Sequence, residues 1–188
     1  MFVGVVPRNP ADLSHNKITN HGVRLLSKII GSKSVVMSLN LCDNQIHKDG
    51  GKYLGRALKR NDSLIDLNLR LNRLDDEGGR MLFEGLRNNS SVTYLNVCSN
   101  AMRGESAKAL AVCLANPDSA LVSLDMSGNR LNEGDAELIK DALQESVSLT
   151  ALDLRANPDV PATSDALAEI LRTTRRNELH QRKLAQEA

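Results

Sequence analysis

Apolar and polar positions follow a short pattern that returns along the whole chain. In most copies two apolar residues stand two positions apart, and an asparagine follows three positions later; the asparagines are Asn16, Asn44, Asn72, Asn100, Asn129 and Asn157. Their separations are 28, 28, 28, 29 and 28 residues. Because successive side chains of a strand point to opposite faces, an apolar pair such as Leu39 and Leu41 predicts a short strand with one buried face.

The segments between these strands have the spacing of amphipathic helices. In residues 48–60, apolar or small residues stand at Tyr53, Leu54, Ala57 and Leu58, which places them on one helix face. Two apolar rows recur: Leu26, Leu54, Leu82, Leu110, Ile139 and Leu167, and Ile30, Leu58, Leu86, Leu114, Leu143 and Leu171. We expect a row of small residues to let helix and strand approach closely: Ala57, Gly85, Cys113 and Ala142.

One strand, one turn and one helix in every 28 residues are typical of a leucine-rich repeat solenoid. The predicted fold class is therefore α/β: a segment of a right-handed horseshoe, with six parallel strands on the concave face and helices on the convex face. One coil cannot bury its apolar face alone, so stability comes from contacts between neighbours. We expect the six asparagines to form a structural ladder, in which each side chain binds backbone groups of its own turn and of the adjacent coil.

The two ends of the chain differ in composition from the repeats. We expect an irregular segment over residues 1–9, a repeat domain over residues 10–171, and a polar, basic helical extension over residues 172–188. No capping segment precedes the first copy, so either the chain is a piece of a longer repeat protein or a neighbouring molecule covers that end. We expect Leu167, Ile170 and Leu171 to finish the other end of the stack.

The extension is either a solvated helix or a basic arm for an acidic partner. Its candidate arm residues are Arg172, Arg175, Arg176, Arg182 and Lys183.

The composition narrows the classes of partner. Among the 188 residues, aromatic residues make up 2% and Trp is absent, which disfavours an aromatic platform for nucleic acid. The net charge of +1 gives no general attraction to nucleic acid or membrane, and no apolar run approaches the length of a membrane span. An odd count of three cysteines favours reduced, intracellular thiols. Two glycosylation sequons, at Asn61 and Asn89, lie 28 residues apart and are better explained by the repeat.

Residues between the buried leucines of each strand form columns on the predicted concave face. The candidate partner contacts are Asn40, Asp66, Asn68, Arg70, Tyr94, Asn96, Asp125, Asp153 and Arg155. Asn and Asp are common in the middle column of such repeats for solubility, so Arg70, Tyr94 and Arg155 are the stronger anchors. Leu71, at an exposed turn, is either a contact or a scattered surface leucine.

Catalytic motifs are missing from the sequence. The four histidines occupy unrelated repeat positions, and no His, Cys and Asp set has the spacing of a metal site. The chain contains neither a phosphate-binding loop nor a recognised nucleophile motif. We therefore expect a non-enzymatic protein without catalytic residues, cofactor or metal, and without a small-molecule substrate.

The repeat unit resembles the ribonuclease-inhibitor-like class of leucine-rich repeats over residues 8–171. The phrases LNLCDNQIHKDGGKYLGRAL and LNLRLNRLDDEGGRMLFEGL are similar to repeats of the T-complex-associated testis-expressed family, a leucine-rich subunit of the nexin–dynein regulatory complex of cilia and flagella. This resemblance implies a scaffold within a large protein complex, in the cytoplasm, at the cytoskeleton of the axoneme. The chain departs from that family because it lacks the long N-terminal portion.

Two other functions stay open at this point. Ran-type GTPase-activating proteins resemble the chain in repeat length, but they usually end in a strongly acidic tail, whereas this chain ends with basic residues. Leucine-rich repeat enzyme inhibitors are rich in cysteine and acidic on the inner curve, whereas this chain has three cysteines and a charge near neutral.

Overall fold

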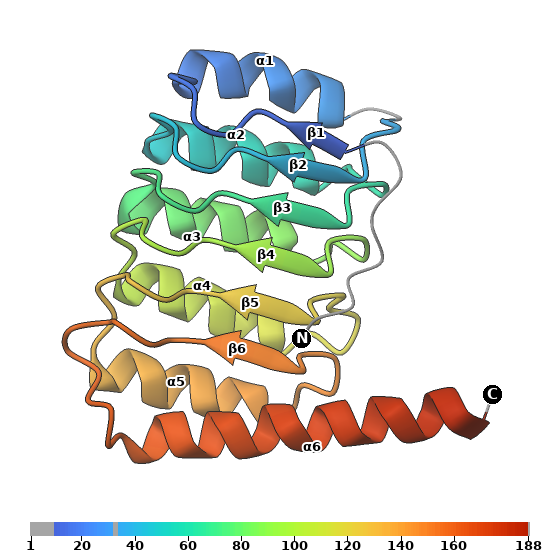
Figure 1. Cartoon of the computed structure of the whole chain (residues 1–188), viewed down its shortest axis with the longest axis vertical. Coiled ribbons are helices and arrows are strands. Elements are labelled where there is room, and N and C mark those ends of the chain that lie inside the picture. The colour runs from blue at the N-terminus through green and yellow to red at the C-terminus, as the bar shows by residue number, and fades with distance from the viewer. Residues whose placement is uncertain (1–9, 32–33, 188) are drawn as a thin grey trace.

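The computed structural model describes residues 10–31 and 34–187, so the expected irregular segment 1–9 lies outside the described residues. Six short strands form one parallel sheet in chain order (Figure 1). The strands are β1 (Pro10–Asp12), β2 (Ser38–Asn40), β3 (Asp66–Asn68), β4 (Tyr94–Asn96), β5 (Ser123–Asp125) and β6 (Ala151–Asp153). A helix follows each strand: α1 (Asn20–Ile30), α2 (Lys48–Leu58), α3 (Asp75–Leu86), α4 (Gly104–Leu114), α5 (Glu133–Leu143) and α6 (Asp165–Glu187).

Strands and helices form two layers, with the sheet on one side and the helices on the other (Figure 1). The predicted fold class, a leucine-rich repeat solenoid, is confirmed. We call the side of the sheet that faces away from the helices the strand face. Strand residues one repeat apart are direct partners in the sheet, for example Leu39 with Leu67 and Leu67 with Leu95.

The core is a set of aliphatic layers between the sheet and the helices. Leu41 and Leu69 are fully buried and Leu154 is 3% exposed, as the alternation predicted. The inner helix rows are buried in the middle coils, through residues such as Leu54, Leu82 and Leu110. Each coil covers the next, so burial is completed only by stacking.

From the second coil on, the asparagine of each turn connects its own coil with the preceding one. The side-chain amide of Asn44 donates to Leu41 O (3.1 Å) in its own coil and to Leu13 O (3.0 Å) in the preceding one. Its Oδ1 accepts from Ile18 N–H at 2.9 Å. Asn72, Asn100, Asn129 and Asn157 make equivalent bonds and are buried, whereas Asn16, in the first coil, is exposed. The bonds satisfy turn backbone that water cannot reach.

A second set of asparagines binds backbone at the ends of the helices. Asn61 donates to Ile30 O at 2.7 Å, and Asn89 donates to Leu58 O at 2.8 Å. Both side chains are 5% exposed, and their amide nitrogens are occupied by these bonds. The 28-residue spacing of the two sequons therefore has a structural explanation.

The helix of the sixth coil is displaced by three positions from the expected register. The prediction of an inward Leu171 was wrong, because Leu171 is 69% exposed. Leu167 is partly buried against the core and Ile170 is buried, as predicted, and Thr174 is buried as well. Helix α6 starts eight residues after Asn157, whereas α2 and α5 start four residues after their asparagines, because the turn before α6 is longer.

Helix α6 is one continuous helix across the expected boundary at residue 171; its last buried residue is Asn177, and Gln181 still donates to Val147 O at 3.3 Å. Asn177 donates to Ser146 O at 2.9 Å and continues the second asparagine set. Beyond this point α6 extends past the other coils (Figure 1).

Gly85, from the predicted row of small residues, lies against a neighbouring helix, which differs from the expected contact of helix with strand. A β-carbon at Gly85 would lie 2.2 Å from the carbonyl oxygen of Gly55 on the neighbouring helix. A β-carbon at Gly55 would lie 2.2 Å from Met81 O. Helices α2 and α3 therefore cross so closely that only glycine fits at these two positions.

Candidate interaction surface

The strand face presents the side chains on either side of each buried strand leucine. In β2 to β5 the central residue is buried, and the two flanking residues are partly exposed. The sheet register aligns Asp66 with Tyr94, and Asn68 with Asn96. The structure therefore brings the predicted contact residues into columns on one face, with Arg70 and Arg155 exposed at the ends of their strands.

The middle column is largely engaged with its own backbone. The side-chain oxygen of Asn68 accepts from Arg70 N–H (3.0 Å), and Asn96 and Asp125 accept in the same way two residues later (both 2.9 Å). Asn40 and Asp153 repeat the bond. These side chains close the end of each strand, which gives the column a structural role beside any contact with a partner.

The two strand-face arginines differ in their surroundings. Arg155 donates from Nε to both oxygens of Asp153, at 3.0 and 3.1 Å. Hydrogen bonds from the Arg155 side chain hold the pKa of Asp153 below its ordinary value of 3.8. Arg70 has no ion-pair partner within 4 Å among the residues that the structure describes. Arg70 is therefore the arginine whose charge stays available to a partner.

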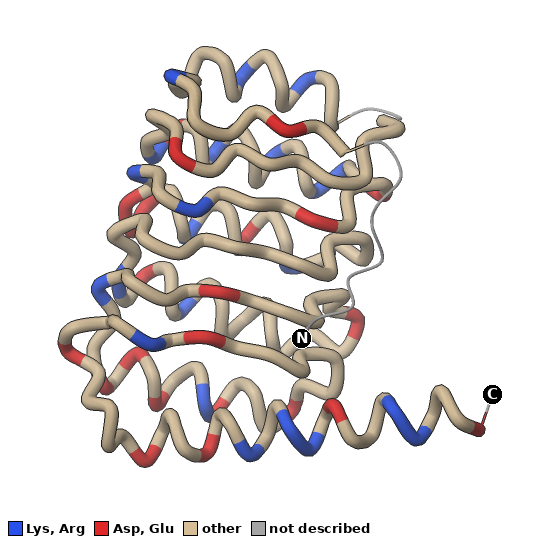
Figure 2. The backbone as a smooth tube through the Cα atoms, viewed as in Figure 1, with Lys and Arg blue, Asp and Glu red and all other residues tan. Residues whose placement is uncertain are grey.

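Acidic groups on the strand face are spread over several coils. Figure 2 shows acidic positions on β1, β3, β5 and β6, and basic positions just after β3 and β6. Asp66 is partly buried, and burial raises its pKa above the ordinary 3.8, while a hydrogen bond from Ser38 opposes this shift. The surface therefore offers separated charges of both signs, a pattern suited to recognition of a mixed protein surface.

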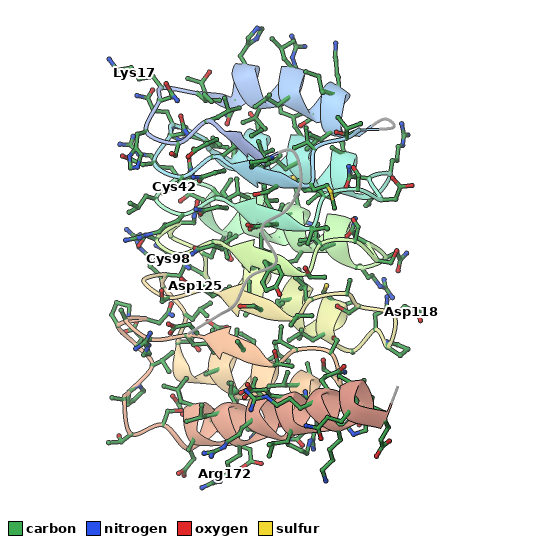
Figure 3. The ribbon with its side chains drawn as sticks, turned by 45° about the vertical axis from the view of Figure 1, so that its right-hand side comes forward. Lys17, Cys42, Cys98, Asp118, Asp125 and Arg172 are labelled. Carbon is green, nitrogen blue, oxygen red and sulfur yellow. The ribbon has the colours of Figure 1, made fainter. Side chains whose placement is uncertain are left out.

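Two of the three thiols, Cys42 and Cys113, are buried. Cys42, Cys98 and Asp125 lie one below another along the stack (Figure 3), but Cys42 is buried and burial raises its pKa. Burial raises the pKa of Cys113 to about 11, so this thiol stays protonated at neutral pH. Within residues 10–31 and 34–187, no three His, Cys, Asp or Glu side chains are grouped to hold a metal ion.

The predicted basic arm lies along the outer side of α6. Arg172 pairs with Glu169 at 2.7 Å and Arg182 pairs with Glu178 at 2.6 Å. Two of the five basic residues of the arm therefore form ion pairs with acidic residues of the same helix. Arg175, Arg176 and Lys183 line a shallow hollow of about 510 Å³ together with Leu179. Figure 3 shows Arg172 on this last helix, at one end of the stack.

Leu71 occupies a special backbone position that the sequence pattern did not reveal. Its φ is 56°, in the left-handed region, and it is 42% exposed. Asp43, Ser99, Gly128 and Ala156 have the same left-handed φ in their own coils. A partial signal is present in the sequence, because Asp43 and Gly128 stand at this position and both residue types adopt the left-handed region at lower cost than Leu does.

The sequence pattern also did not predict that a side chain of one helix caps the start of the next helix. Asp76, in α3, accepts hydrogen bonds from Ser106 N–H (2.8 Å) and Arg103 N–H (2.9 Å) at the start of α4. Asn20, in α1, likewise accepts from the backbone at the start of α2. These caps join helices that are distant in sequence, so the usual local capping pattern does not detect them.

Comparison with known proteins supports the fold. A family model described as leucine-rich repeat matches residues 12–27, 60–83 and 88–111. No curated protein sequence matches the chain. In the part of the chain that the structure describes, no helix is both long and apolar enough to cross a membrane.

Solved structures of similar shape include a segment of leiomodin-1 and a domain of tropomodulin. The leiomodin-1 segment named actin-binding site 2 has a TM-score of 0.63 and 16% identity, and the match covers 97% of this chain and 88% of that one. The C-terminal domain of tropomodulin from Caenorhabditis elegans has a TM-score of 0.67 and 18% identity, over 88% of this chain and 99% of that one. At these identities the likeness shows the fold alone: a leucine-rich repeat solenoid of strand and helix coils.

Proposed function

We propose that the chain is a non-catalytic scaffold that binds a protein partner through its strand face. The observation that carries this proposal is the column geometry: Tyr94 lies on β4, and Arg70 lies two residues after the end of the adjacent strand β3, in a continuous sheet that holds the strands in register. Arg and Tyr are frequent hot-spot residues, and a rigid sheet orders them before binding, which lowers the entropy cost of association. Asp66, beside Tyr94, and the Asp153–Arg155 pair complete the contact surface.

Within this function we propose a place in the nexin–dynein regulatory complex of cilia and flagella, where the chain would contribute to motility. The support is the resemblance of its second and third repeats, LNLCDNQIHKDGGKYLGRAL and LNLRLNRLDDEGGRMLFEGL, to those of the leucine-rich subunit. The partners would be axonemal proteins, and the location would be the cytoskeleton.

Affinity capture from ciliated cells tests this placement. The tagged chain should recover dynein-regulatory proteins above the level of a control leucine-rich repeat protein. If capture repeatedly returns no axonemal protein, the ciliary placement is wrong. Recovery of another saturable protein partner would still leave the scaffold function standing.

Actin binding is a second candidate, suggested by the name of the leiomodin-1 segment whose fold this chain shares along most of its length. Cosedimentation with filamentous actin, compared with a monomer-binding assay, tests it. Binding that saturates near one chain per actin would favour this candidate over the ciliary one.

The two remaining alternatives are activation of a GTPase and inhibition of an enzyme. A Ran-type GTPase-activating protein would accelerate hydrolysis of Ran-bound GTP, and an inhibitor of the ribonuclease-inhibitor class would block a nuclease at low concentration. We expect neither effect, and either one would contradict the scaffold proposal.

A further inference from the structure

Three backbone groups of every coil are used at its junction with the next coil. Two of its amide N–H groups donate to carbonyl oxygens of the next coil, and one of its carbonyl oxygens accepts from an N–H group of the next coil. At the last junction these bonds are Met126 N–H to Asp153 O (2.9 Å), Gly128 N–H to Arg155 O (3.0 Å) and Thr150 N–H to Val122 O (2.9 Å). The three junctions between the second and fifth coils repeat all three bonds at the equivalent residues, and the first junction shows the two N–H bonds, from Leu13 and His15.

The same three groups of the sixth coil are Leu154 N–H, Ala156 N–H and Thr150 O. None of them has a hydrogen-bond partner among residues 10–31 and 34–187. They lie along the outer edge of β6, where they keep the spacing that pairs strands elsewhere in the sheet. An edge with unpaired groups is a template for one more strand.

A hollow lies beside this edge, between the end of the sheet and α6. It has a volume of about 680 Å³. Its apolar lining includes Leu152, Leu167, Ile170 and Leu171, and its polar lining includes Asp125, Asp153 and Arg155 of the strand face. Leu152 is only half-buried, although its equivalents in β2 to β5 are buried at the centre of their strands. The three-position displacement of α6 exposes Leu171 at the same hollow. Apolar side chains of a further strand would be covered there.

We propose that β6 binds an extended peptide segment of a partner protein, which adds to the sheet as a seventh parallel strand. The backbone of the segment accepts from Leu154 N–H and Ala156 N–H and donates to Thr150 O. Its alternate side chains are apolar and enter the hollow at Leu152 and Leu171. A helix does not fit this role, because its own backbone groups are already paired. The inference goes beyond the strand-face function, since it uses the backbone edge at the end of the sheet; Asp153 and Arg155 lie beside both surfaces.

A synthetic peptide with the sequence of residues 64–74, LIDLNLRLNRL, is the probe. Within the chain this segment already pairs with the preceding coil: Ile65 N–H and Asp66 N–H donate to Met37 O, and Asn68 O accepts from Leu41 N–H. Fluorescence anisotropy of the labelled peptide should show saturable binding. In the bound state, amide exchange at Leu154 and Ala156 should slow by about tenfold, because a hydrogen-bonded amide exchanges only on opening. A peptide methylated at the amides of Ile65 and Asp66 should bind at least about tenfold more weakly.

Two exposed leucines of α6 give a matched pair of variants. Leu171→Glu places a charge in the hollow and should weaken peptide binding by about tenfold. Leu179 is 52% exposed, compared with 69% for Leu171, and it does not line the hollow. Leu179→Glu should therefore change the affinity for the peptide by less than about twofold. The double variant Arg70→Ala/Tyr94→Ala should also retain peptide binding, which separates this site from the strand face.

Several outcomes would overturn the proposal. These are a lack of saturable binding, binding without slower exchange at Leu154 and Ala156, and equal loss of binding in the two glutamate variants. Loss of peptide binding in Arg70→Ala/Tyr94→Ala would move the site to the strand face. A concentration-dependent dimer that Leu171→Glu disrupts, without peptide binding, would assign the edge to a second copy of the chain.

Discussion

At the scale of single residues, each buried ladder asparagine satisfies backbone groups of more than one coil. Asn100 is fully buried, donates to Leu69 O (2.8 Å) and Val97 O (3.2 Å), and accepts from Leu74 N–H (3.3 Å). Replacement by Ala would leave these groups buried without partners. We expect Asn100→Ala to lower the free energy of unfolding by about 3 kcal/mol, measured by urea denaturation.

Asn16 is the control for this prediction, because it has the same repeat position but is exposed. Water can replace its bonds, so Asn16→Ala should cost less than about 1 kcal/mol. Equal costs at the two positions would show that the ladder does not act through buried backbone.

The left-handed turn position gives a second prediction at this scale. Leu71, with φ at 56°, bears a β-carbon in a region that Asn tolerates better. Leu71→Asn should raise the free energy of unfolding by about 0.5 kcal/mol, because its side chain is already exposed and little burial is lost. Gly128→Ala should lower it by about 1 kcal/mol, since φ is 65° and a β-carbon would lie 2.8 Å from Ser99 Oγ. Thermal unfolding in which Leu71→Asn is the more damaging change would contradict this account.

At the scale of elements, neighbouring helices stabilise one another through caps. Asp76 is partly buried, which raises its pKa, but hydrogen bonds from the backbone of Ser106, Glu105 and Arg103 outweigh this and lower the pKa below 3.8. The ionised carboxylate is thus preferred in the folded state. Its stabilisation is fully present above pH 3.8, the unfolded value, and is lost as pH falls through the lower folded pKa.

We therefore expect Asp76→Ala to destabilise the protein at pH 7 by about 1 kcal/mol, the usual worth of a helix cap. The difference from the wild type should shrink as the pH is lowered below 3.8, because the wild-type carboxylate becomes protonated. Denaturation curves at pH 7 and at pH 3 measure both effects. A difference that grows on acidification would exclude this role for Asp76.

The register of α6 gives the second prediction at the element scale. Ile170 is 3% exposed and Leu171 is 69% exposed. Ile170→Ala should cost about 2–4 kcal/mol, because it opens a cavity in the last core layer, and Leu171→Ala should cost less than about 0.5 kcal/mol. If the two costs were reversed, the original row of Leu143 and Leu171 would be the correct register.

At the scale of the whole molecule, most of the fold follows from local repetition. Each coil specifies its own strand, turn and helix, so the 28-residue period was enough to predict the parallel order of the strands and the buried rows. The period could not predict the longer turn after Asn157, and therefore not the exposure of Leu171. It also could not show which side chains of the middle column bind their own backbone, because that depends on the geometry of each strand end.

The candidate contact residues were predictable as columns but not as a binding site. Asp153 and Arg155 pair with each other, whereas Arg70 has no ion-pair partner in the described residues. This difference in pairing between Arg155 and Arg70 depends on side-chain conformation, which cannot be read from a single sequence. The open edge of β6 is likewise a property of the assembled sheet, since every strand sequence looks the same whether or not another strand follows.

The strand-face account is tested most directly by the affinity of the captured partner for Arg70→Ala/Tyr94→Ala, measured below the unfolding temperature. The matched control is Arg56→Ala/Tyr53→Ala, which removes the same residue types from helix α2. We predict that the strand-face variant loses at least about 2 kcal/mol of binding free energy, roughly thirtyfold in affinity, while the helix variant binds as the wild type does. Unchanged affinity in the strand-face variant, or an equal loss in the helix variant, would contradict binding through the strand face.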